Sequence, residues 1–165
     1  MRLIQLVCAA LSGLSLTSAL ALPSEPSNTT TDLISTKHLL RRDAFLTSAS
    51  ITFHTNDEDK DGNSHLTITV KDSTKSISAA LDSDFARFGD NNDDGPFDLE
   101  MFNPSSRADV RAGTVTLRLD PHGQDTWRFN WQMTFVFSDG TKMRAQLSGV
   151  ELTQDKREKT WNVVG

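Results

Sequence analysis

A run of alternating apolar and polar residues between positions 126 and 138 constrains the fold of this chain more than any other feature. In the sequence TWRFNWQMTFVFS, large apolar side chains occupy every second position from Trp127 to Phe137, and polar residues take most of the positions between them. Successive side chains of a β-strand point to opposite faces, whereas residues two apart on a helix spread around its axis. The pattern therefore predicts a long strand with one buried face.

Weaker alternation of the same kind predicts seven further strands, with no helical pattern between them. The Asp139-Gly140 pair predicts a type I′ hairpin turn after the long strand, and Gly149 interrupts the following alternation, which predicts a β-bulge. We expect an all-β fold, a single antiparallel β-sandwich of about eight strands or a jelly-roll-like arrangement of them. The expected strands are 48–56, 64–71, 75–81, 97–102, 113–120, 126–138, 142–152 and 159–164.

The first residues have the three-part form of a secretory signal peptide. A basic Arg2, an apolar run over 3–16 and the small-residue exit at 19–21 predict a signal peptide at 1–21 and therefore secretion. The alternative, a membrane anchor, is disfavoured because the apolar run is shorter than the ~20 residues that a bilayer requires.

Residues 22–42 are rich in proline, serine and threonine and predict a propeptide without regular structure. Arg41-Arg42 resembles the dibasic site of kexin-type processing proteases; the alternative is an ordinary solvated basic pair. Cleavage there would leave a domain at 43–165 and would remove the glycosylation sequon at Asn28.

The predicted mature domain is acidic and disulfide-free. It keeps 13 of the 17 basic and 20 of the 22 acidic residues, for a formal charge of −7, which disfavours binding to nucleic acid. The single cysteine, Cys8, lies in the signal peptide. A core, a metal ion or both must therefore hold the domain.

Two acidic loops share one spacing of oxygen ligands. Each places Asp or Asn at positions 1, 3 and 5 before a glycine, as in the first half of an EF-hand loop. Position 12, which requires glutamate, is Ile68 in one loop and Met101 in the other, so we exclude an EF-hand. The loop residues are Asp57, Asp59, Asp61 and Gly62, and Asp90, Asn92, Asp94 and Gly95.

If successive strands alternate in direction, these two loops lie at the same end of the sandwich, together with 120–125 and the segment after 152. Ca²⁺ takes six to eight oxygen ligands, and two such loops can supply them jointly. The alternative is that these residues are only the polar residues of exposed turns. The predicted calcium ligands are Asp57, Asp59, Asp61, Asp90, Asn92 and Asp94, with Asp98, Asp125 and the backbone carbonyl of Glu58 or Lys60 as further contacts.

An acidic loop after the first strand, a later acidic loop and the late strand DTWRF resemble the C2 and PLAT/LH2 β-sandwich families over nearly all of 48–164. The resemblance implies an eight-stranded sandwich that binds calcium at one loop end and meets a membrane surface or a protein partner there. The chain departs from membrane-docking C2 domains because only Phe85, Phe88 and Phe97 lie near the loops, without a large exposed apolar tip.

The function that these patterns favour is a secreted, non-catalytic binding module with calcium at its acidic loop end. The alternative is a calcium-stabilised carbohydrate-binding module, in which Trp127 at the start of the long strand contacts the glycan; Trp131 and Trp161 are the other candidates.

A small secreted hydrolase is a further alternative. The chain has no G-x-S-x-G or H-E-x-x-H motif and no cysteine after position 8. His54 and His65 could face each other across the first hairpin and bind zinc with the aspartates, and Asp57 and Asp90 could form a glycosidase pair.

Overall fold

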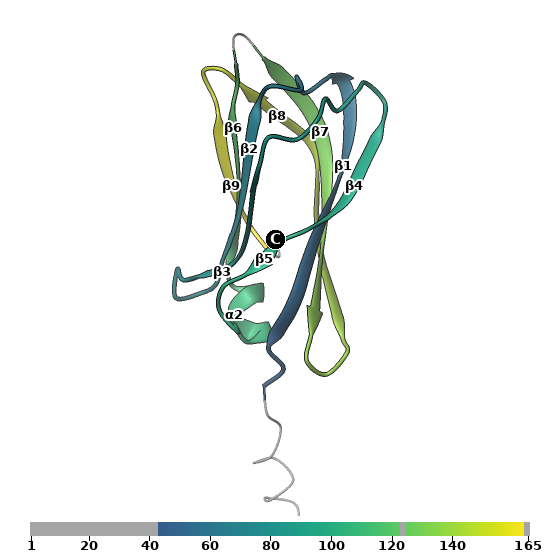
Figure 1. The fold of residues 1–165 in the computed structure, drawn as a ribbon. Helices are drawn as coiled ribbons and strands as arrows, with labels where there is room; N and C mark the ends of the chain where they lie inside the picture. The colour runs from purple at the N-terminus through teal and green to yellow at the C-terminus, as the bar shows by residue number, and fades with distance from the viewer. Residues whose placement is uncertain (1–42, 123–124, 164–165) are drawn as a thin grey trace, which may run out of the picture. The chain divides into compact units, whose positions relative to one another are not determined.

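The computed structural model of the protein describes residues 43–122 and 125–163. Two antiparallel β-sheets pack face to face and form a β-sandwich, which confirms the predicted fold class (Figure 1). The strands are β1 Leu46–Glu58, β2 His65–Lys71, β3 Ile77–Ser83, β4 Asp93–Asp98, β5 Glu100–Met101, β6 Thr114–Asp120, β7 Thr126–Phe137, β8 Lys142–Thr153 and β9 Glu158–Asn162, and the helix is α2 Arg107–Arg111.

The order of strands shows which distant parts of the chain lie side by side. One sheet has the order β4-β1-β7-β8, and the other has the order β5-β3-β2-β6-β9. The first strand therefore pairs with β7, more than 70 residues later, and not with β2, its neighbour in sequence. Since β1 and β2 belong to different sheets, the loop between them crosses one end of the sandwich.

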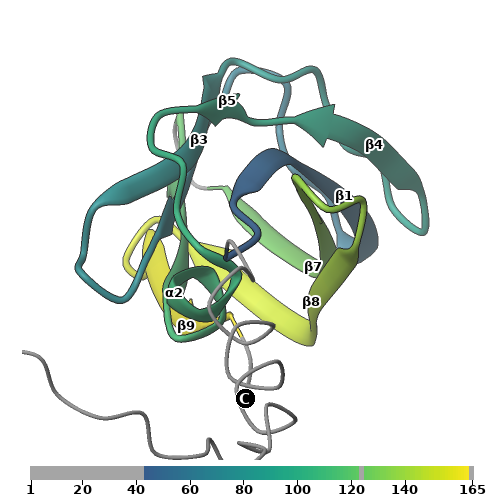
Figure 2. The same cartoon turned by 90° about the horizontal axis from the view of Figure 1, so that it is seen from below.

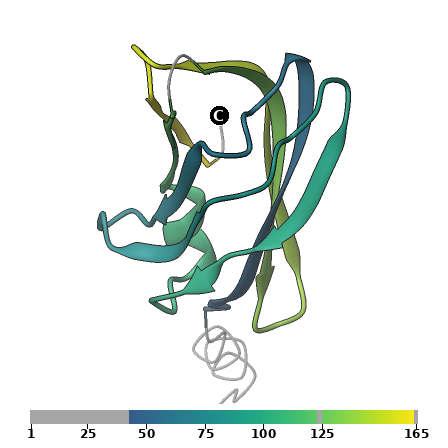
Figure 3. The same cartoon turned by 45° about the horizontal axis from the view of Figure 1, so that its top comes forward.

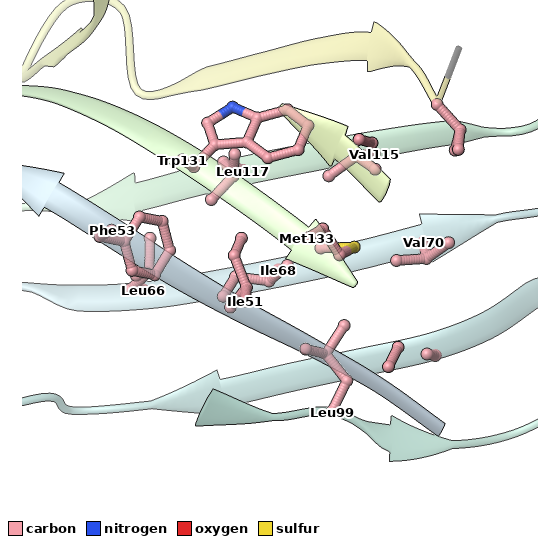
Figure 4. Close-up of a cluster of buried hydrophobic side chains, with 14 of the residues drawn as sticks. Ile51, Phe53, Leu66, Ile68, Val70, Leu99, Val115, Leu117, Trp131 and Met133 are labelled. Atoms are coloured by element: carbon pink, nitrogen blue, oxygen red, sulfur yellow. The ribbon is translucent and has the colours of Figure 1, made fainter. Parts of the chain in front are cut away.

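The core lies between the sheets and follows the alternation read from the sequence. In β7 every second residue from Trp127 to Phe137 is buried, and the residues between them are only partly buried. Opposite this stripe, Leu66, Ile68 and Val70 of β2 are fully buried (Figure 4). Burying a large apolar side chain contributes about 1.5–3 kcal/mol, so the interlocked stripes stabilise a domain without disulfides.

The strand expected at 97–102 is split between the two sheets. β4 pairs with β1 in the four-stranded sheet, Leu99 is buried, and β5 then pairs with β3 in the other sheet. The Leu99 amide still donates to the Ala49 carbonyl at 2.9 Å, so the chain leaves β1 only after this residue. An apolar run predicts burial between sheets but does not specify which sheet each of its residues joins.

A short helix, α2, lies in a connection where no helix was expected, at the end opposite the acidic loops (Figures 1 and 2). Ser106 caps it, because its Oγ accepts a hydrogen bond from the Asp109 amide at 3.1 Å. Serine followed by an acidic residue three positions later is a helix-start signal, and this pattern at Ser106 and Asp109 would have predicted the turn of helix.

The two glycine predictions for β7 and β8 have different outcomes. A bulge is confirmed at Gly149, where φ is +67° and the β7–β8 register shifts. The hairpin turn is present at 138–141, but the type I′ assignment is wrong, because Gly140 has a φ of +77° while Asp139 does not adopt positive φ. A longer turn with a single left-handed glycine joins the strands instead.

The signal peptide, the propeptide, Asn28 and the Arg41-Arg42 site lie outside the described residues and stay predictions. Within 43–122 and 125–163, no helix is both long enough and apolar enough to cross a membrane.

Gly113 permits a close approach of backbone after α2. A Cβ atom at this position would lie 2.1 Å from the Lys71 carbonyl oxygen, whereas a Cβ at Gly89 would meet nothing within 4 Å. We expect Gly113→Ala to lower the free energy of unfolding by about 1–3 kcal/mol, since the β2 end must shift. Gly89→Ala, the matched control, should stay within about 0.5 kcal/mol of the unmodified protein in urea unfolding. Equal effects would contradict the packing at Gly113.

Candidate functional site

The two acidic loops lie side by side at one end of the sandwich, as predicted (Figure 3). Lys60 and Phe88 exchange two backbone hydrogen bonds of 3.1 Å, and the Asn91 amide donates to the Asn56 carbonyl at 2.8 Å. The loop carrying Asp125 joins them, because an Asp125 carboxylate oxygen accepts from the Asp61 amide. The backbone therefore brings together three loops that are far apart in sequence.

The carboxylates of the first acidic loop pair with cations of the chain itself. Arg87 forms an ion pair with Asp59. Arg128 lies 3.5 Å from Asp57 and 3.9 Å from Glu58, and its Nε donates to Glu151 at 2.8 Å. Repulsion among the acidic side chains at this end is thus reduced without a bound ion.

Lys60 supplies a third internal cation and is completely buried. Its ammonium group donates to the carbonyl oxygens of Asp61 at 2.9 Å and Phe85 at 3.2 Å, and lies 5.3 Å from the centre of the Phe88 ring. Burial lowers the Lys60 pKa, although Asp125, Asp61 and Asp84 act in the opposite direction. Lys60 therefore ties the first acidic loop to the second from within.

The second acidic loop does not complete a coordination sphere. Asn92 Nδ2 donates to Asp94 Oδ1 at 3.3 Å, while Asp90 and Asp98 are exposed, with Asp98 opposite Ser50 on the β1–β4 pair. Among the described residues, no three Asp, Glu or His side chains form a group that could hold a metal ion. The six predicted ligands share one end but do not converge, and calcium binding stays a prediction.

Two further candidate contacts, Asp125 and Trp127, are part of the interior. Asp125 accepts from Ser64 Oγ at 2.5 Å and holds the loop before β7. Trp127 is 0% exposed, stacks on Phe129 with ring centres 3.7 Å apart and donates from Nε1 to Thr55 Oγ1 at 3.1 Å. The hypothesis that Trp127 offers an exposed surface for sugars is therefore wrong. Trp127 lies near the start of β7, where its ring packs against Phe53 and Phe88.

The two histidines that flank the first acidic loop lie in different sheets, which contradicts the interpretation that they face each other across a hairpin. His54 Nδ1 lies 2.8 Å from Asp93 Oδ1. His65 lies between two carboxylates, with Nδ1 2.5 Å from Asp84 and Nε2 bonded to Asp82. Hydrogen bonds to Asp84 and then to Asp82 raise the pKa of His65.

A groove of about 440 Å³ lies on the outer face of the four-stranded sheet. Thr52, Gln132 and Gln146 stand opposite one another across β1, β7 and β8, and form a row in its middle. A second row places Asp93, His54 and Asn130 across β4, β1 and β7. The polar residues between the apolar residues of β7 were the sequence signal for this groove. In the sequence they served only to assign the buried face of the strand.

The polar residues of this groove are mostly neutral, unlike those of the other sheet. On the outer face of the five-stranded sheet, Arg118 donates a hydrogen bond to Asp120 and lies 3.8 Å from Glu158. On the same sheet, His65 pairs with the carboxylates of Asp82 and Asp84. Amide side chains offer both donors and acceptors, and Gln132 and Gln146 line the groove on β7 and β8, whereas its ionisable residues, His54, Asp93 and Asp94, lie on β1 and β4. The groove can therefore form hydrogen bonds with a neutral ligand that both donates and accepts.

No protein-family model matches this chain, and no curated protein matches it. The resemblance to C2 and PLAT/LH2 domains stays a prediction, while the β-sandwich itself rests on the structure.

If the acidic end binds calcium, adding calcium to the chelated protein should raise its stability against thermal unfolding. A ligand that binds only the native state raises its stability, so calcium at about 100 times its Kd should add about 2.7 kcal/mol. Asp59→Ala also removes the ion pair with Arg87, so it should lower thermal stability more with calcium present than after chelation. Differential scanning calorimetry with added calcium, magnesium or zinc measures this. Unchanged unfolding with every ion, or an equal loss in Asp59→Ala with and without calcium, would show that the acidic end depends on its own cations.

The raised pKa of His65 predicts how the stability of the protein depends on pH. Its folded-state pKa is raised above about 6.5, so its contribution is fully present below that value and is lost as pH rises through the folded-state pKa. We expect His65→Gln to destabilise the protein more at pH 5 than at pH 9, as measured by urea unfolding. The same loss at both pH values would contradict a protonated His65 between Asp82 and Asp84.

Proposed function

We propose that this protein is a secreted, non-catalytic binding module whose ligand is a neutral, hydroxyl-rich chain such as a polysaccharide. One observation carries the proposal: a row of neutral hydrogen-bonding side chains, Thr52, Gln132 and Gln146, crosses three adjacent strands in the groove on the four-stranded sheet. Secretion rests on the predicted signal peptide at 1–21.

The chemistry of the groove suits sugars because each sugar hydroxyl both donates and accepts hydrogen bonds. Gln132 and Gln146 provide amide groups, and Thr52 adds a hydroxyl beside them. Neighbouring strands lie about 4.8 Å apart, so a row across three strands presents hydrogen-bonding groups along roughly 10 Å of ligand. A groove of about 440 Å³ lies within the range of known small-ligand sites.

Asn130 holds the groove in shape through two hydrogen bonds of its side chain. Asn130 Oδ1 accepts from the Gly149 amide at 2.8 Å, and its Nδ2 donates to Asn56 at 3.1 Å. The bond from the Gly149 amide fixes the bulge in β8, which lies next to Gln146 and Ser148. Asn130 therefore supports the groove by positioning β8, while Gln132 and Gln146 remain available to a ligand.

The proposal predicts loss of binding in two glutamine variants. Affinity electrophoresis in gels with soluble neutral polysaccharides (mannan, xylan, β-glucan or glycol chitin) should show retarded migration of the protein. Each of Gln132→Ala and Gln146→Ala removes one or two hydrogen bonds of about 0.5–1.5 kcal/mol, so affinity should fall by about threefold to tenfold or more.

Gln154→Ala is the matched control, because Gln154 is exposed in the β8–β9 connection, away from the groove. It should bind as the unmodified protein does. Migration unaffected by every polysaccharide, or equal losses in all three glutamine variants, would contradict the proposal.

A further inference from the structure

A second groove lies at the edge of the sandwich, between β8 and β9. β8 is the last strand of one sheet and β9 is the last strand of the other, and each pairs with the strand inside it, β7 or β6. The groove has a volume of about 440 Å³, within the range of known small-molecule sites. Its lining residues are Trp131, Gln146, Leu147, Thr160, Trp161, Asn162 and Val163.

Trp131, which lines this groove, carries a buried hydrogen-bond donor without an acceptor in the part of the chain that the structure describes. Trp131 is 3% exposed, and its Nε1 has no hydrogen-bond partner among the described residues. Trp127 in the same strand, by contrast, donates to Thr55. Leaving a buried donor unpaired costs about 1–3 kcal/mol, and buried tryptophans usually pair this group. Figure 4 shows the nitrogen of Trp131 turned away from Leu117, on the side of the pale yellow strands.

Trp161 forms the aromatic wall beside this donor. Its ring centre lies 5.9 Å from that of Trp131, and the ring planes make an angle of 55°, so the two indoles are tilted and do not cover each other fully. Trp161 is only partly buried, which leaves part of its ring accessible. Leu147 and Val163 add apolar surface, and the exposed Asn162 supplies a polar group at the rim, beside Thr160, whose hydroxyl is hydrogen-bonded to that of Thr116 at 2.8 Å.

We propose that the groove between β8 and β9 binds a small neutral molecule that has a flat ring and an acceptor oxygen. The oxygen accepts a hydrogen bond from Trp131 Nε1, and the ring lies against Trp161. All seven lining residues are uncharged, so a charged ligand would lose its hydration there without gaining an ion pair.

This site adjoins the polysaccharide groove, and substitutions can distinguish the two. The two grooves have Trp131, Gln146 and Leu147 in common, but the first contains the outward side chains of the four-stranded sheet, while the second includes Trp161 and Val163 of the other edge. Variants at Gln132 and Trp161 therefore separate them, because each residue lines one groove and not the other.

Acetophenone, a planar ring with one carbonyl oxygen, is a suitable probe for the full chain. The protein has three tryptophans, so an NMR spectrum of the ¹⁵N-labelled protein contains three indole signals, and Trp131→Phe identifies the one from Trp131. Titration to about 10 mM acetophenone, above a millimolar Kd, should shift the Trp131 signal in a saturable manner. Ethylbenzene, which lacks the oxygen, should bind about threefold to tenfold more weakly.

Substitutions assign the two contacts. Trp161→Ala should weaken acetophenone binding by about tenfold because it removes the aromatic wall, while Gln132→Ala should leave it unchanged. Circular dichroism confirms folding of each variant, and the titration of the unmodified protein decides the matter if Trp161→Ala does not fold. An unmoved Trp131 signal, equal binding of ethylbenzene, or full affinity in folded Trp161→Ala would overturn the proposal.

Discussion

The structure depends on the burial of one face of β7 between the two sheets. β7 lies in the interior of its sheet, paired with β1 on one side and β8 on the other. Its inward side chains fill the core from Trp127 at the acidic end to Phe137 at the far end, and nothing covalent replaces this packing in the described domain. The positions of the loops next to β1 and β8 follow from it, because both strands are held at the register that β7 sets.

The acidic end shows how a highly charged cluster of loops is stabilised from inside. Lys60, Arg87 and Arg128 each approach carboxylates or carbonyl oxygens of neighbouring loops, and Lys60 does so while fully buried. Exposed ion pairs contribute little individually, about 0–1 kcal/mol each. The buried ammonium differs, because its removal would take the side-chain donor from the Phe85 carbonyl oxygen beside the Phe88 ring, whereas the Asp61 carbonyl oxygen would keep the Ser64 amide.

Both proposed binding surfaces involve β8, because neighbouring residues of a strand point to opposite faces, and Gln146 and Leu147 are neighbours in it. The bulge at Gly149 is anchored by Asn130, and next to it Gln146 projects outward while Leu147 turns toward the sandwich edge. As the edge strand of its sheet, β8 also borders the groove that separates it from β9. The same short segment thus contributes to a polar groove on the sheet and to an aromatic groove between the sheets.

The sequence by itself determined the fold class, most strand positions, the buried face of β7, the bulge at Gly149 and the common end of the acidic loops. These follow from local alternation and from parity, which depend only on the order of residues. It did not determine that 93–101 would divide between two sheets, that Trp127 would be covered, or that arginines and Lys60 would meet the aspartates. Those outcomes arise from contacts between residues far apart in the chain, such as Arg87 with Asp59 and β1 with β7. Only the tertiary structure fixes which surfaces meet, because a period of two specifies a face of a strand but not its partner.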